Sequence, residues 1–116
     1  MAIKINTPKE LIGNLFLTTG ASVALYTAPE DTTTIIRKLV FTNTGSAGRT
    51  VTVYIVPSGE SPEDKNKIIP SQSVDTEEAW PCYQVTDIVL EEGDSIHANA
   101  DVGNAVGVFC SGVEVS

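Results

Sequence analysis

The chain has few of the residues on which catalytic and metal sites are usually built. It contains one histidine, His97, and two cysteines, Cys82 and Cys110, among 116 residues. The cysteines lie far apart in the sequence and form no cluster with the histidine, so no structural zinc site is expected. Motifs for phosphate loops, dinucleotide binding, nucleophilic serines and zinc proteases are absent. We therefore expect no catalytic residues, no cofactor and no metal.

Basic residues are missing from the second part of the chain. Residues 1–67 carry seven basic and six acidic groups, whereas residues 68–116 carry nine acidic groups and no basic one, which together give the net charge of −8. This balance argues against nucleic acid or a membrane surface as a partner, because both require clustered Lys and Arg. The acidic part is either a solvated surface that keeps the protein soluble or a surface that docks on a basic neighbour.

Long apolar runs are also missing. No run approaches the ~20 residues of a membrane-spanning helix, and the first residues have no apolar signal segment. Hydrophobic residues nevertheless make up 41% of the chain, which is typical of a globular protein and sufficient for one core. The length predicts one compact domain.

What the sequence has in quantity is β-branched residues. Val, Ile and Thr total 36 of the 116 residues, and they recur in short stretches separated by turn residues. We predict an all-β fold, an antiparallel β-sandwich of jelly-roll-like form with about eight strands. The clearest prediction is a hairpin of residues 32–43 and 49–56. Residues 83–90 and 105–115 are predicted strands, and Gly107 and Gly112 predict bulges or close backbone approach in the second of these.

The first twenty residues are predicted as an N-terminal arm that precedes a sandwich domain of residues 21–116. A capping-box pattern at Thr7–Glu10 indicates a short helix over residues 8–13. The apolar residues Ile3, Ile5 and Leu11 fit an extended arm equally well. Such an arm either closes the domain's own sheet or packs on a neighbouring subunit.

Three further features bear on partners. Alternation places His97 on the solvent-facing side of a strand. Glu91, Glu92 and Asp94 around Gly93 form either a charged turn or, together with Asp87 or Asp101, oxygen ligands for calcium. Cys110 is expected in the core and Cys82 half-buried, with a disulfide between them left open. Trp80 packs in the core or lies at an interface, and Tyr26, Tyr54 and Tyr83 could share a sugar-binding groove with it. The candidate interface residues are Ile3, Ile5, Leu11, Trp80 and Tyr83.

The order of strands and turns resembles that of small virion structural proteins of tailed bacteriophages. The resemblance is carried by Leu25–Pro29, Ile35–Asn43, Val51–Gly59, Val89–Ile96 and Ser111–Glu114. It implies a short β-sandwich without chemistry, located in the virion, which docks in many copies on major capsid or tail proteins and forms a homo-oligomer. A capsid decoration protein is the leading interpretation. A receptor- or carbohydrate-binding module on a tail or fibre is the alternative.

Overall fold

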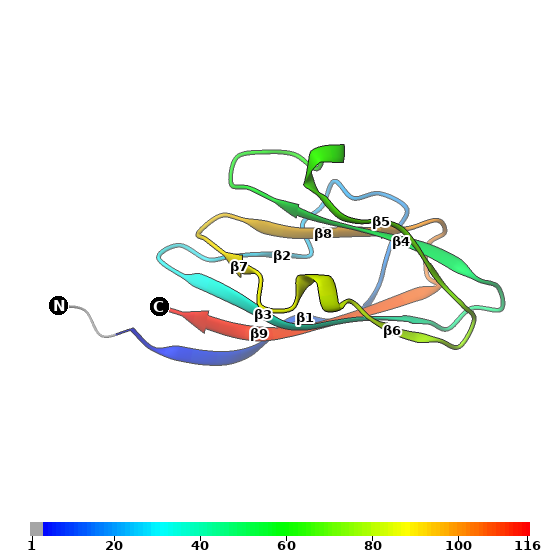
Figure 1. Ribbon diagram of the computed structural model, residues 1–116, viewed down its shortest axis with the longest axis horizontal. Coiled ribbons are helices and arrows are strands. Elements are labelled where there is room, and N and C mark those ends of the chain that lie inside the picture. Colours follow the sequence, from blue (N-terminus) through cyan, green and yellow to red (C-terminus); the bar gives the residue numbers. More distant parts are fainter. Residues whose placement is uncertain (1–3) are drawn as a thin grey trace.

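Two antiparallel sheets packed as a sandwich make up the fold, as predicted (Figure 1). The computed structural model describes residues 4–116. Sheet A has the order β1-β9-β3-β6, with β7 also paired to β3, and sheet B has the order β2-β8-β4-β5. The nine strands are β1 (Asn6–Phe16), β2 (Tyr26–Thr27), β3 (Thr33–Asn43), β4 (Arg49–Val56), β5 (Lys67–Val74), β6 (Ala79–Pro81), β7 (Val89–Leu90), β8 (Ser95–Ala100) and β9 (Val106–Val115).

Most connections cross from one sheet to the other; only β4 and β5 follow each other within sheet B, and β6 and β7 within sheet A, which is the connectivity of a jelly roll. The first long strand, β1, pairs with the last, β9, so the first and last strands both lie in sheet A. Two short 3₁₀ helices, η1 (Asp64–Asn66) and η2 (Tyr83–Val85), interrupt the connections. No helix within residues 4–116 is long and apolar enough to cross a membrane.

The predicted helix over residues 8–13 is wrong, because this segment is part of strand β1. Its backbone pairs with β9 from Asn6 to Phe16, and Leu11 and Ile12 bury their side chains in the core. Pro8 is compatible with this position because an edge strand leaves alternate N–H groups unpaired. Of the two interpretations of the arm, residues 6–16 therefore follow the one in which it closes the domain's own sheet.

The predicted hairpin is also wrong, although both of its strands exist. Strand β3 lies in sheet A and β4 in sheet B, so the loop between them turns a corner of the sandwich. The buried side chain of Asn43 holds this corner: its Nδ2 donates to the carbonyls of Ala47, at 2.9 Å, and Val74, at 3.0 Å. Its Oδ1 accepts a hydrogen bond from the Gly45 N–H at 2.9 Å.

Residues 83–90 do not form the predicted continuous strand. They fold as the 3₁₀ turn η2 followed by the two-residue strand β7, and Asp87 between them has a positive φ of 66°. The Asp87 N–H donates to the Ile36 carbonyl at 2.7 Å, so the turn stays tied to β3. Apolar content alone could not separate this turn from a strand.

One core lies between the sheets and draws on nearly every strand. Phe41, Ile36, Val53 and Ile96 are among the side chains with no exposed surface. Close backbone approach is confirmed at Gly112, where a Cβ would clash with the carbonyl oxygen of Ile35 on the neighbouring strand.

Candidate docking face

The outer face of sheet A carries apolar side chains that no other part of residues 4–116 covers completely. We call it the sheet A face, and cross-strand pairing defines it because directly paired residues lie on the same side of a sheet. Val40 pairs with Phe109, Ile35 pairs with Val113, and Phe16 pairs with Gly107. Phe16 is 47% exposed, and the others are intermediate in burial. The outer face of a sandwich is normally polar, so this apolar surface is a candidate docking face.

A hollow of about 220 Å³ opens on this face between β1, β3 and β9. It exists because Gly107 contributes no side chain to the row between Phe16 and Thr42. A Cβ at Gly107 would meet no atom closer than 3.9 Å, so the fold does not require glycine there. The hollow lined by Phe16, Val40 and Phe109 suits one apolar side chain of a partner.

A second groove of about 450 Å³ continues the face toward β6 and η2. It shares Val40 with the first hollow, and its other lining residues include Arg37, Pro81 and Tyr83. Tyr83 is 76% exposed, which makes it, with Val23, the most exposed large hydrophobic residue among those that the structure describes. The two hollows together extend from β1 across the sheet to η2.

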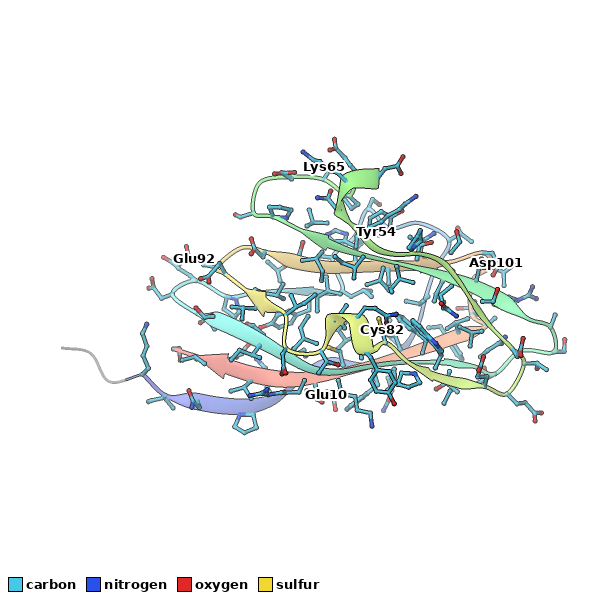
Figure 2. All side chains as sticks on the ribbon, in the orientation of Figure 1. Glu10, Tyr54, Lys65, Cys82, Glu92 and Asp101 are labelled. Carbon is cyan, nitrogen blue, oxygen red and sulfur yellow. The ribbon has the colours of Figure 1, made fainter. Side chains whose placement is uncertain are left out.

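Few charges lie on the sheet A face. Glu10 and Lys38 are both exposed, and both pair with Ser111 of β9, one from each side. Arg37 is the extra residue of a β3 bulge and forms an ion pair with Asp87 at 2.5 Å. Glu10 lies on the opposite side of the molecule from Tyr54 and Lys65 of the sheet B side (Figure 2).

The predicted interface residues lie in different environments. Ile3 lies outside the described residues, Ile5 is 63% exposed beside the C-terminus, and Leu11 is buried in the core, which removes it from the surface. Trp80 is half-buried and stacks on Phe41 with ring centroids 6.3 Å apart, so its core-packing interpretation holds. Tyr83 lines the second groove. Sequence reasoning missed Phe16, Val40 and Phe109. A signal for Phe109 was present, because apolar residues at consecutive positions of β9 indicate a strand that is apolar on both faces.

The aromatic residues proposed for a shared groove are not brought together. Tyr54 lies on sheet B beside Lys67, whose Nζ is 6.0 Å from the ring centroid. Trp80 and Tyr83 belong to the sheet A side. Tyr26 joins the two sheets instead. A carbohydrate site built on all four residues is therefore not present.

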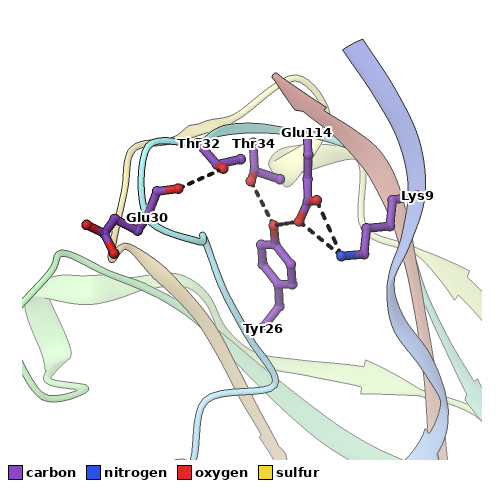
Figure 3. Close-up of polar contacts among 6 residues, drawn as sticks. All are labelled: Lys9, Tyr26, Glu30, Thr32, Thr34 and Glu114. Carbon is purple, nitrogen blue, oxygen red and sulfur yellow. Dashed lines mark hydrogen bonds and ion pairs between the residues drawn. The ribbon is translucent and has the colours of Figure 1, made fainter. Parts of the chain in front are cut away.

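Tyr26 belongs to a polar cluster that ties the edge of sheet B to sheet A (Figure 3). Its hydroxyl donates to Glu114 Oε2 at 2.6 Å and lies 2.8 Å from Thr34 Oγ1. Lys9 Nζ lies 3.3 Å from Glu114 Oε1. Burial, reinforced by the hydrogen bond to Glu114, raises the pKa of Tyr26 to about 12. The cluster secures β1, β2, β3 and β9 at one end of the sandwich.

The prediction of a surface histidine is wrong. His97 is buried, and its Nδ1 donates to the Ala21 carbonyl at 2.5 Å while Nε2 lies 2.9 Å from Ser95 Oγ. The irregular segment between β1 and β2 runs along β8, where the Ala100 N–H donates to the Thr18 carbonyl, and it covers the side that alternation left open. With both ring nitrogens engaged, His97 joins this segment to β8.

The carboxylates of the acidic turn accept hydrogen bonds from backbone N–H groups, both within the turn and on two other segments. Asp94 accepts hydrogen bonds from the N–H groups of Glu91 and Ser58, both at 3.0 Å, and Glu92 accepts one from the Asp31 N–H at 2.9 Å. Asp101, a further candidate ligand, lies at the opposite end of the molecule from Glu92 (Figure 2). Across residues 4–116 no group of three potential metal ligands is found. The backbone hydrogen bonds of Asp94 and Glu92 are those expected of a charged turn.

Both cysteines are buried and free, so the open disulfide question is answered against a bond. Cys110 lies in the core as expected, whereas Cys82 is fully buried and not half-buried. Burial raises the pKa of Cys82 and raises that of Cys110 to about 12. Neither thiol is poised as a nucleophile, because the reactive form is the thiolate.

Comparison with known proteins identifies no family for this chain. No protein-family model matches the sequence, and no curated protein matches it. Among solved structures, the chain is similar to one from "Structure of infectious bursal disease virus Gx strain", at 12% identity and a TM-score of 0.34. The match covers 97% of this chain and 31% of that chain, so this chain spans about a third of the viral chain's length.

Proposed function

We propose that this protein is a non-enzymatic structural component of a virus particle, which attaches to other proteins through the sheet A face. The observation that carries the proposal is the apolar outer surface around Phe16, Val40 and Phe109, with its hollow at Gly107. Apolar surface rimmed by a few polar groups is the ordinary composition of a protein-binding patch.

The environment of the chemically reactive residues supports a structural role. His97 joins two segments, the carboxylates of the acidic turn accept backbone hydrogen bonds, and the cysteines lie in the core. Each of these groups is engaged in contacts that stabilise the fold. In an active site, such groups would instead be available to a substrate. This use of the reactive side chains within the fold supports the proposed structural role.

The finer proposal is a decoration protein on the head lattice of a tailed bacteriophage. It rests on the resemblance in strand and turn order, because jelly rolls serve in capsids and in lectins alike and the fold alone does not decide. A shell offers many equivalent sites, so a small contact repeated in every copy adds up to a large total stabilisation. A carbohydrate-binding module is less well supported, because its aromatic residues are dispersed.

The copy number in purified particles tests this proposal. Quantitative mass spectrometry of particles, calibrated against the major capsid protein, is expected to find hundreds of copies of this chain per particle. A handful of copies would point to a tail tip or fibre and overturn the decoration role. Absence from purified particles would overturn the structural role altogether.

A further inference from the structure

We propose that the partner of the sheet A face is a second copy of this chain, bound face to face about a two-fold axis that runs along β9. The inference rests on the proposed function only in taking this face as a docking surface. A homodimer interface must be complementary to itself, and the arrangement of charges on the face meets that condition.

Glu10 and Lys38 form the charged row of the face. Both pair with Ser111, Glu10 from β1 and Lys38 from β3, so they stand on either side of β9. Neighbouring strands are about 4.8 Å apart, which puts the two side chains roughly 10 Å from each other. Among the ion pairs of residues 4–116, neither residue has a partner.

Rotation about an axis along β9 exchanges the two sides of the face. The β1 side of one copy then lies over the β3 side of the other, so that Glu10 meets Lys38 of the second copy. The symmetry makes this contact twice, and Ser111 faces its own equivalent at the centre. One charge of each sign at equal distance from the axis is the pattern that such a dimer requires.

The apolar residues lie where the same axis brings them together. Phe109 and Val113 belong to β9 itself, on either side of Ser111, and would meet their own equivalents. The hollows at Gly107 of the two copies face each other next to the Phe109 rings and give these rings room to interdigitate, as side chains do where sheets pack face to face.

The charge balance of the face favours this partner over a strongly charged protein. Glu10, Lys38 and the Arg37–Asp87 pair sum to zero, so the net charge of −8 lies on other surfaces. A strongly acidic or basic partner would leave Lys38 or Glu10 opposite a like charge, which is costly at an interface. A stable interface takes about 800 Å² from each partner, a modest part of the 6332 Å² accessible surface.

Sedimentation velocity on the purified full chain over a concentration series tests the dimer. We expect the wild type to be dimeric at micromolar concentration. Glu10→Lys and Lys38→Glu each place two like-charged pairs in the interface and should weaken the dimer by about tenfold or more. The double variant exchanges the charges and should restore the wild-type dissociation constant.

Matched variants control for net charge and folding. Glu30→Lys and Lys65→Glu make the same charge changes away from the sheet A face and should leave the dimer intact. Gly107→Val fills the hollow at a site where a Cβ has room, so it should weaken the dimer while thermal unfolding shows an intact fold. Circular dichroism of every variant separates loss of the dimer from loss of the fold.

Three results would overturn the dimer. They are a monomeric wild type across the series, single charge variants that dimerise like the wild type, or a double variant that stays as weak as the single ones. None of these results bears on the number of copies per particle, so failure of the dimer and failure of the proposed function are distinguishable.

Discussion

At the scale of single residues, Gly112 and His97 each contact a segment that is distant in the sequence. Gly112 was expected to mark a close backbone approach because a glycine within an apolar strand usually does, and the Ile35 carbonyl confirms it. His97 was misplaced because alternation assumes an open outer face. The segment that carries Ala21 covers that face, and nothing near His97 in the sequence reports it.

The two glycines of β9 provide a matched pair of stability predictions. Gly112→Ala should lower the free energy of unfolding by about 1–3 kcal/mol, because the new Cβ meets the backbone of β3. Gly107→Ala places its Cβ in ordinary van der Waals contact, 3.9 Å from the nearest atoms, and should leave the stability within about 0.5 kcal/mol of the wild type. Urea unfolding measures both, and equal effects would contradict the packing described for β9.

Tyr26 gives the protein a pH-dependent contribution to stability. Its pKa is raised from 10.0 to about 12 in the fold, so the fold favours the neutral hydroxyl. This contribution is complete below pH 10 and is lost as the pH rises through 12. Tyr26→Phe should cost about 1–2 kcal/mol at pH 7, because Glu114 loses a hydrogen-bond donor.

The free energy of unfolding should be measured from pH 8 to 12 for the wild type and for Tyr26→Phe. The difference between the two isolates the contribution of the Tyr26 hydroxyl from that of other groups that titrate in this range. The difference between wild type and Tyr26→Phe should shrink above pH 10. A constant difference would show that the Tyr26 hydroxyl has the same pKa in the folded and unfolded states.

At the scale of elements, the sequence predicted strands more reliably than their partners. The strands β3 and β4 lie close to their predicted ranges, yet they belong to different sheets. A loop of five residues fits a hairpin and a corner equally well, and the corner depends on the contact of Asn43 with Val74, 31 residues away. The capping pattern at the start of β1 predicted a helix, but this segment pairs with β9 instead. Pairing is favoured because it satisfies the backbone hydrogen bonds and also buries Ile12.

Strand β1 should therefore be essential to the fold. Ile12→Ala leaves a cavity in the core and should cost about 2–4 kcal/mol, whereas Leu15→Ala, at a site that is 40% exposed, should cost less than about 1 kcal/mol. Deletion of residues 1–12 should abolish cooperative thermal unfolding. A truncated chain that still unfolds cooperatively would show that the segment is an accessory arm.

At the scale of the whole molecule, composition and the spacing of strand-like segments predicted the sandwich. The docking face could not be predicted in this way, because it depends on the register in which the strands of sheet A pair. Bulges in β1 and β3 shift which side chains point outward, and a shift of one residue moves a side chain to the other face. Phe16, Val40 and Phe109 therefore became neighbours only in the folded structure. The acidic excess of residues 68–116 indicated a negative net charge but did not show on which faces of the molecule the charged side chains lie.

Footprinting of the chain within assembled particles tests the central claim most directly. Hydroxyl-radical labelling of Phe16 and Phe109 should fall strongly in particles relative to the dilute monomer, because the sheet A face is covered by protein. Tyr54, on sheet B, should be labelled equally in both states. Unchanged labelling of Phe16 and Phe109 together with protection of Tyr54 would contradict docking through sheet A.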